Sequence, residues 1–414
     1  MSEKNRTGKC PIAADDFRGF DHHSPNHRDS VEALWARMRD LPNLPHSESY
    51  GGFYVVTRHA DLRSAAGLHK IYSSADGLAL PNEDRTRHIP AEVDPPLQRE
   101  YRRILDPFLT PDYVARHESM VREIAVELLE GLADESRLDV VSRFTEPFPV
   151  FAALAIFGFP RADAARLNDL VERLIHGRGS VAAKQASMDL TDYLVQLLTA
   201  RADSADPSTD IVAAVAAGRV EGRSLSLDEQ VSITRLLLFG GFTTVNLALS
   251  STLNVLARQP QMADALRAAP DLYRTALEEF VRYASPGTYL RRTVTGAAEL
   301  GGSSLHRGDQ LLLCFGAANR DPKVFDRPDE LVLDRNPNPH VGFGFGAHRC
   351  MGSAIAKLEI RVALEEILNR YERLELDPDR PAVWGQGETQ GLTSLPMILK
   401  RRGSDSNSNQ GRDT

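Results

Sequence analysis

Cys350 lies in a short stretch whose residue types and spacing could hold a metal. The residues Phe343-Gly344-Phe345-Gly346-Ala347-His348-Arg349-Cys350-Met351-Gly352 come directly before a strongly helical run, so we expect the sulfur near a helix N-terminus. The N–H groups and the dipole at that end favour a thiolate and lower its pKa. A thiolate is a soft and strongly donating metal ligand, and glycines let the backbone approach a flat partner closely. The alternative is a buried structural cysteine in a glycine-rich loop.

A second group with possible chemistry lies inside a long apolar helix that we expect from Ser226 to Arg258. It contains two adjacent glycines, Gly240 and Gly241, followed by Thr243 and Thr244. Each helical glycine costs about 1 kcal/mol relative to alanine, which indicates a purpose such as a kink or a close approach. A threonine hydroxyl can bond the carbonyl four residues back and hold a local widening open. A simple packing kink is the alternative.

Glu279 and Arg282 lie three residues apart in a helix expected over about 272–283. This spacing puts both side chains on one helix face, where they can pair. Taken alone the signal is weak, because most pairs of this kind are exposed to solvent.

Composition limits the classes of function that the chain can have. It has 414 residues, a net charge of −8 and a pI near 5.9, and 42% of its residues are hydrophobic. An acidic balance argues against nucleic acid or an anionic membrane as the main partner. The three cysteines are odd in number and widely spaced, which does not fit a disulfide framework and favours a reducing cytoplasm. Neither a signal peptide nor an apolar run long enough to span a membrane is evident.

The elements that must position these residues are mostly helical. We expect a helix after Asp29 or Ser30, a strand over 53–57, and a long irregular loop over 73–95. Helical periodicity dominates from 98 to about 202, short strand-like runs fill 292–316, turns fill 317–349, and a final helix covers 353–371. We expect a loose segment over 1–25, a single domain over 26–402, and a disordered tail over 403–414.

The cysteine stretch resembles the cytochrome P450 signature F-G-x-G-x-H-x-C-x-G, with matches at Phe343, Gly344, Gly346, His348, Cys350 and Gly352. The resemblance implies that Cys350 is the axial ligand of haem b iron, that Phe343 shields the sulfur from water, and that His348 hydrogen-bonds a haem propionate. The implied fold is mainly α with a minor β region. It is a triangular helical prism in which the haem lies between the long central helix and the helix after the cysteine.

Other segments resemble further parts of this family. Glu279 and Arg282 match its buried helical pair, with Arg335 as the third member of the network. The segment 94–102 resembles the family's D-P-P helix start, which implies that Arg102 binds a propionate. Gln98 stands where many members have histidine, so one propionate contact would be missing or weaker. Arg292 matches the second propionate arginine, and Arg291 competes with it because strand parity would let only one of them face the haem.

The glycine-threonine stretch resembles the family's A/G-G-x-D/E-T motif, which implies that Thr244 is the alcohol that steadies activated oxygen and positions water for proton delivery. The chain departs from the motif at Thr243, which occupies the position of the usual acid. A threonine cannot relay protons as a carboxylate does at neutral pH. Waters with Thr243 could substitute, another residue could supply the proton, activation could be slow, or the enzyme could use peroxide or catalyse a reaction that needs no second proton.

The resemblance implies a monooxygenase that uses O2, a small or medium hydrophobic substrate, and electrons from a separate ferredoxin and its NAD(P)H reductase. Arg349 and Lys357 could help to dock an acidic ferredoxin, or they could be ordinary solvated charges. A peroxide-driven peroxygenase or isomerase and a non-catalytic haem ligand-binding protein are the alternatives. Arg85, Arg87 and His88 could recognise a substrate carboxylate, although a solvated loop face is the simpler interpretation. Expected pocket residues are the loop 76–90, Leu236, Phe239, Gly240, Thr288, Leu290, Leu392 and Thr393.

Overall fold

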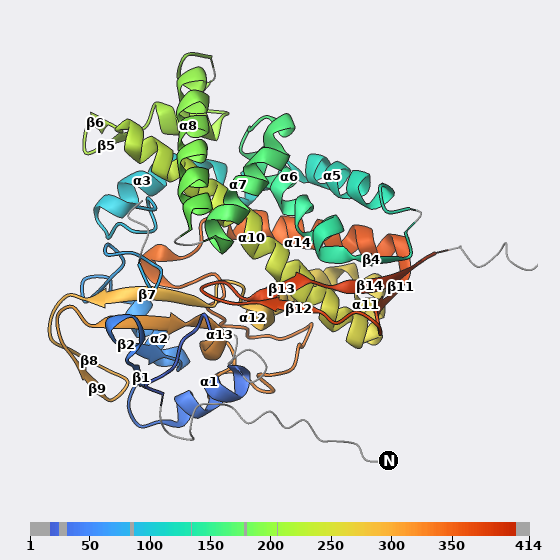
Figure 1. The fold of residues 1–414 in the computed structure, drawn as a ribbon. Helices are drawn as coiled ribbons and strands as arrows, with labels where there is room; N and C mark the ends of the chain where they lie inside the picture. The colour runs from blue at the N-terminus through green and yellow to red at the C-terminus, as the bar shows by residue number, and fades with distance from the viewer. Residues whose placement is uncertain are drawn as a thin grey trace, which may run out of the picture.

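The computed structural model describes residues 17–24, 31–82, 87–133, 135–177, 180–204 and 206–402. Helices form most of the molecule, and a smaller sheet region lies at one side of them (Figure 1). This arrangement confirms the expected mainly α fold with a minor β region. The expectations for 1–16 and for the tail over 403–414 lie outside the described residues.

The central element is α10, Leu227–Arg258, which packs against α6, α8, α12 and α14. Ser226 caps it with a capping box, because its hydroxyl accepts from the Glu229 N–H while the Glu229 carboxylate accepts from the Ser226 N–H. By length and composition α10 could cross a membrane, but 72% of its most apolar window is buried inside the protein. Its apolar composition is therefore accounted for by its place in the core.

The other helices surround α10 or cover the sheet region (Figure 1). Their bounds are α1 Val31–Asp40, α2 His59–Gly67, α3 Leu97–Leu105, α4 Pro111–Ala115, α5 Glu118–Glu130, α6 Pro147–Ile156, α7 Ala164–His176, α8 Val181–Ser204, α9 Ile211–Ala216, α11 Pro260–Ala268, α12 Tyr273–Ala284, α13 Phe315–Ala318 and α14 Ser353–Arg370. The predicted starts of α1, α12 and α14 agree with these bounds to within a residue or so.

The main sheet has the strand order β1-β2-β10-β7-β3, in which β10 pairs with β2 in parallel and the other neighbours are antiparallel. Its strands are β1 His46–Ser47, β2 Phe53–Val56, β3 Tyr72–Ser73, β7 Tyr289–Val294 and β10 Gln310–Cys314. A three-stranded sheet of order β11-β14-β4 and three two-stranded ribbons use β4 Arg137–Asp139, β5 Arg219–Val220, β6 Arg223–Ser224, β8 Ala298–Leu300, β9 Ser303–Leu305, β11 Tyr371–Leu376, β12 Val383–Gly385, β13 Gly391–Ser394 and β14 Pro396–Arg401.

Three expectations about local structure meet different outcomes. The expected loop holds, because the described residues between β3 and α3 form only turns and bends. The expected helical stretch 98–202 is interrupted by β4, which pairs with β14 far along the chain. The start of the chain was expected to be loose as far as residue 25, but residues 17–24 are packed, with Phe17 and Phe20 buried in a core cluster beside Trp35. Buried aromatic rings outweigh the polar character of that segment.

Candidate functional site

The cysteine loop forms a tight turn directly before α14. The Cys350 N–H donates to the Phe343 carbonyl over 2.7 Å, which closes the loop, and Gly344 has a φ of +75°, in the left-handed region that favours glycine. Gly346, with a φ of +72°, does not line the cavity described below. A Cβ there would lie 2.8 Å from the Ala66 carbonyl, so this glycine lets the loop pack against α2. Gly346 therefore serves the tight turn that the sequence predicts and the packing of the loop against α2.

Cys350 is exposed and lines the cavity described in the next paragraph. Burial raises the pKa of the Cys350 thiol, and the Gly352 N–H and the charges of Arg102 and Arg349 oppose this rise without cancelling it. The sequence predicts a lowered pKa from the helix N-terminus, but in the protein alone the desolvation of the sulfur outweighs the Gly352 N–H and the two arginines. A bound metal cation deprotonates a coordinating thiol.

The cavity has a volume of about 370 Å³ and lies between α10 and α14. Leu236, Gly240 and Thr244 line it from α10, and Met351 and Ile355 line it from the opposite side. Most of the wall is apolar, which suits a hydrophobic molecule. The sulfur and the glycine-threonine stretch thus face one enclosed space, although more than 100 residues separate them in the sequence.

The two glycines of α10 have different surroundings. A Cβ on Gly240 would meet nothing within 4 Å, so this position leaves open space beside the cavity. A Cβ on Gly241 would lie 2.9 Å from the Ala153 Cβ, so Gly241 allows the close approach of α6. The Thr244 hydroxyl donates to the Gly240 carbonyl over 3.1 Å, the bond expected from the sequence. Of the two purposes that the sequence suggested for these glycines, a kink or a close approach, the contact of Gly241 with α6 supports the close approach, and α10 is continuous from Leu227 to Arg258. The Thr243 hydroxyl is buried without a hydrogen-bond partner and does not line the cavity.

Glu359 is a cavity residue that the sequence analysis missed. It lies on α14, is fully buried, and neither of its carboxyl oxygens has a hydrogen-bond partner. Burial raises the pKa of Glu359 well above its ordinary value of 4.5, because desolvation disfavours the charged carboxylate. Its position nine residues after Cys350, on the inner face of a predicted helix, was the only available signal.

Replacing Glu359 with glutamine is expected to stabilise the holoprotein, and more so at higher pH. A raised pKa in the folded state contributes stability that is complete below about pH 4.5 and is lost as pH rises, because the unfolded carboxyl ionises first. Glutamine removes this loss. Urea unfolding at pH 5, 6.5 and 8 measures the effect, with the exposed Glu123→Gln as control. An unchanged pH slope in Glu359→Gln would contradict the assignment.

A polar group of residues surrounds the loop at the opposite rim of the cavity. Gln98 donates to the Ala347 carbonyl over 2.7 Å, and Arg102 donates to the carbonyls of Ala347 and Arg349, both over 2.9 Å. Both residues line the cavity, as His348 does. His348 Nε2 lies 3.1 Å from the Ser74 hydroxyl, while its buried Nδ1 has no partner.

Arg292 is a buried cation next to this rim. Burial lowers the pKa of Arg292 to about 10 and the charge of Asp94 opposes this, yet no carboxylate among the described residues lies within ion-pair distance of it. Arg291 instead donates to the Asp76 carbonyl over 2.6 Å and to Thr293, so it is directed to the loop. The geometry therefore favours Arg292 over Arg291 as the partner of a buried anion. The cavity is lined by the Cys350 thiol and by His348, whose Nδ1 has no hydrogen-bond partner, and the buried cation Arg292 acts on His348 electrostatically. This combination fits a planar anionic metal porphyrin.

Glu279 and Arg282 form a buried ion pair on α12, and each side chain is 0% exposed. Arg282 Nε and Nη2 donate to the two carboxylate oxygens of Glu279 over 2.7 and 2.8 Å. Arg335 Nε lies 3.0 Å from the same carboxylate, as the sequence analysis expected for the third member. Arg282 also donates to the carbonyls of Asn319, Pro328 and Glu330. The network joins α12 to the segment that leads into the cysteine loop, so its geometry is that of a structural support.

The expected pocket residues divide into two groups. Leu236, Gly240 and Leu290 line the cavity, but Phe239, Thr288, Leu392 and Thr393 do not, and those four expectations are wrong. Leu392 is fully buried beside α10, where its carbonyl accepts from Ser250, and Thr288 lines a separate cavity. The turn before β13 contributes Glu388 and Thr389 instead. The residues that line the cavity lie four positions before Leu392 and Thr393. The sequence did not show where the turn before β13 lies relative to the cavity.

The loop 76–90 contributes less to the cavity than expected. Of its described residues Pro90 lines the cavity, and the next residue, Ala91, does so as well. The His88 ring lies against Phe239, with centroids 5.6 Å apart, and the Arg87 carbonyl accepts from Ser232. Arg85 lies outside the described residues.

Comparison with known proteins agrees with this geometry. The family described as Cytochrome P450 matches residues 156–392. The chain is 31% identical over 399 residues to putative cytochrome P450 126 of Mycobacterium tuberculosis, covering 92% of this chain and 95% of that protein. It is 29% identical to linalool 8-monooxygenase of Pseudomonas putida over 386 residues, covering 88% and 95%. The solved structure of the polyketide synthase cytochrome P450 PksS of Bacillus subtilis matches with a TM-score of 0.83 and 26% identity, covering 92% and 100%.

The chain belongs to the cytochrome P450 family and has its fold, and it is an oxidoreductase of the monooxygenase class. Membership implies a haem cofactor, O2, a hydrophobic substrate and a source of electrons. The residues present fit the haem. Cys350 would hold the iron through its sulfur, and Arg102, His348 and the neighbouring Arg292 would offer donors and positive charge to the propionates.

Proposed function

We propose that this protein is a cytoplasmic monooxygenase that inserts one oxygen atom of O2 into a small or medium hydrophobic substrate. It uses haem b held by Cys350 and receives electrons from a separate ferredoxin and its NAD(P)H-dependent reductase. The observation that carries the proposal is that Cys350, Thr244 and an apolar wall share one cavity. The thiolate-bound haem supplies oxygen activation, since sulfur donation favours O–O cleavage.

The chain's own residues bind the substrate, exclude water from the cavity and deliver protons. Leu236 and Leu290 exclude water and hold an apolar substrate by its surface. Thr244, whose hydroxyl is anchored to the Gly240 carbonyl, positions a water molecule at the groove. Thr243 cannot act as an acid, so protons must reach the cavity through ordered water. Glu359 is the candidate proton source, because it is the buried carboxyl that lines the same cavity as Thr244.

Electron transfer requires a partner to approach the face that carries the cysteine loop. Arg349 is exposed there and is a suitable contact for an acidic ferredoxin. Lys357 is a weaker candidate, since its ammonium group pairs with Glu278 and lies over the Phe343 ring at 5.3 Å.

The test compares two oxidant systems. Purified holoprotein is screened by spectral titration against a library of apolar molecules, and the best ligand is then offered with ferredoxin, reductase and NADPH or with hydrogen peroxide alone. Product that depends on NADPH and O2 supports the proposal. Product from peroxide alone would instead support a peroxygenase, which the buried hydroxyl of Thr243 in place of an acid favours. Reversible ligand binding without any product would indicate a non-catalytic haem protein.

Replacing Thr244 with alanine is expected to uncouple turnover. The hydroxyl that would orient water beside Gly240 is lost, so proton delivery is impaired and more of the reducing equivalents should be released as hydrogen peroxide. Peroxide released per NADPH consumed should rise severalfold while product falls. Thr252→Ala, a buried α10 threonine that bonds the Ala248 carbonyl over 2.8 Å, is the matched control. Tight coupling in Thr244→Ala would contradict the assigned role.

A further inference from the structure

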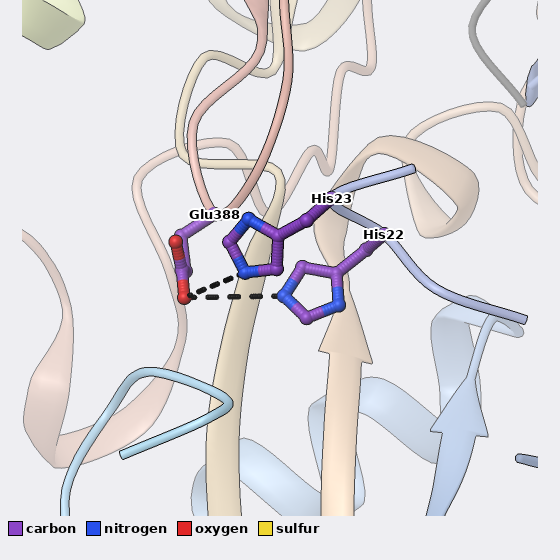
Figure 2. A group of neighbouring side chains, drawn as sticks. All are labelled: His22, His23 and Glu388. Carbon is purple, nitrogen blue, oxygen red and sulfur yellow. Dashed lines mark ion pairs between the residues drawn. The ribbon is translucent and has the colours of Figure 1, made fainter. Parts of the chain in front are cut away.

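Two adjacent histidines and a glutamate converge outside the cysteine site. His22 and His23 come from the packed segment 17–24, and Glu388 comes from the turn before β13 (Figure 2). His23 Nε2 lies 3.5 Å and His22 Nε2 lies 3.9 Å from the same carboxylate oxygen of Glu388. The three ligand-type atoms all lie within 4.8 Å of one another.

The segment that carries the histidines is held in place before any ligand binds. Phe20 is fully buried, and the Asp21 carboxylate accepts from the His23 N–H over 2.9 Å and from the Tyr50 hydroxyl over 2.7 Å. The His22 ring lies against the Tyr289 ring, with centroids 5.2 Å apart. A rigid set of ligands loses little conformational entropy on binding.

The turn that carries Glu388 is shaped to accept His23. Gly387 has a φ of +111°, and a Cβ there would lie 3.0 Å from His23 Nδ1. The Glu388 carbonyl accepts from the Tyr289 N–H over 3.0 Å, which ties the turn to β7. Glycine at 387 therefore allows both the backbone turn and the close approach of the imidazole.

His22 is a buried imidazole without a hydrogen-bond partner. Its side chain is 0% exposed, and neither Nδ1 nor Nε2 has a hydrogen-bond partner among the described residues, since the Glu388 carboxylate lies 3.9 Å from Nε2. An unsatisfied buried polar group is costly and calls for an explanation.

We propose that His22, His23 and Glu388 form a binding site for a divalent transition metal, with Zn²⁺ as the expected ion. Two imidazoles and one carboxylate are a ligand set that zinc accepts, with a water as fourth ligand. Ligand atoms around tetrahedral zinc lie roughly 3.4 Å apart, and two of the separations here are 3.5 and 3.9 Å. His23 Nε2 must exchange its 3.0 Å contact with the Leu80 carbonyl for the metal, whereas His22 has no such bond to lose.

A metal at this site would act on the central cavity. Glu388 and Thr389 line that cavity, and Thr389 forms a β-bridge with Gly287, another lining residue. The Leu80 N–H donates to Glu388 over 3.3 Å, so the metal joins the N-terminal segment, the loop near Leu80 and the cavity wall. Metal binding should therefore restrain this wall and change the affinity for cavity ligands. The metal site itself does not depend on the proposed reaction.

The experiment measures Zn²⁺ binding to the haem-loaded full-length protein, prepared without a histidine tag and treated with chelator. Isothermal titration and elemental analysis after dialysis give affinity and stoichiometry, and the thermal midpoint is measured with and without Zn²⁺. The variants His23→Gln and Glu388→Gln remove one ligand each, and both positions are only partly buried. His306→Gln is the control, because His306 is 80% exposed and lies 3.9 Å from Asp309.

We expect one equivalent of Zn²⁺, a higher thermal midpoint with Zn²⁺, and at least a tenfold loss of affinity in each ligand variant but not in His306→Gln. A spectral titration with a neutral apolar ligand should then show a zinc-dependent affinity that Glu388→Gln abolishes. Absence of tight zinc binding to the holoprotein would overturn the proposal. Binding of one equivalent of Zn²⁺ with unchanged affinity in both His23→Gln and Glu388→Gln would also overturn the proposal.

Discussion

Replacing Cys350 with serine is expected to abolish the thiolate-type carbon monoxide spectrum and to lower product formation on the order of 10³-fold, which is about 4 kcal/mol of barrier. Serine keeps the size of the side chain and the loop bond from its N–H to the Phe343 carbonyl. It replaces a soft, deprotonated sulfur with a neutral oxygen that donates far less electron density. The absorbance spectrum of the reduced carbon monoxide complex measures the loss directly.

Cys314→Ser is the matched control for this experiment. Cys314 is fully buried in β10, and burial raises the pKa of its thiol to about 12, so it is inert. We expect this variant to keep the thiolate-type spectrum at normal haem content. A Cys350→Ser protein that also kept that spectrum would remove the basis of the ligand assignment.

Replacing Arg282 with alanine is expected to cost about 3–5 kcal/mol of unfolding free energy, because it leaves the buried Glu279 carboxylate without its main partner. The change also removes donors to the carbonyls of Asn319, Pro328 and Glu330. Since these carbonyls lie on the segment that leads to the cysteine loop, haem retention should fall as well. Urea unfolding and the ratio of haem to protein absorbance measure the two effects.

A matched control exists on α3, where Glu100 and Arg103 repeat the same E-x-x-R spacing at the surface. Arg103→Ala should cost less than about 1 kcal/mol, because exposed ion pairs contribute little. Arg282→Lys keeps the charge but not the two-pronged geometry, so we expect an intermediate loss. Equal stability of Arg282→Ala and Arg103→Ala would contradict a supporting role for the buried network.

The same comparison illustrates what sequence could and could not predict. Both E-x-x-R pairs place their charges on one helix face, and this follows from helix geometry alone. Only one pair is buried, because α12 packs against α10 and α14 while the Glu100–Arg103 face of α3 is open to solvent. The resemblance to a family identified Glu279 and Arg282 as the buried pair, whereas the spacing is the same in both pairs and could not distinguish them.

Cavity residues show the same limit. The cysteine loop was predictable because its glycines, histidine and cysteine are neighbours in the chain. Leu236 and Leu290 were found, but Leu392 and Thr393 were chosen where Glu388 and Thr389 line the wall. Which side chains of the short strand β13 face inward, and where the turn before it lies, depend on what the strand packs against.

Local chain chemistry by itself determined the turn of the cysteine loop, the capped central helix, the Gly240–Thr244 bond and the family. Each of these depends on residues within a few positions of one another. Only the tertiary structure decided that Glu359 is buried without a partner, that the thiol pKa is raised, and that His22 and His23 meet Glu388. Burial and the meeting of distant residues are properties of the packed chain, and no spacing along the sequence specifies them.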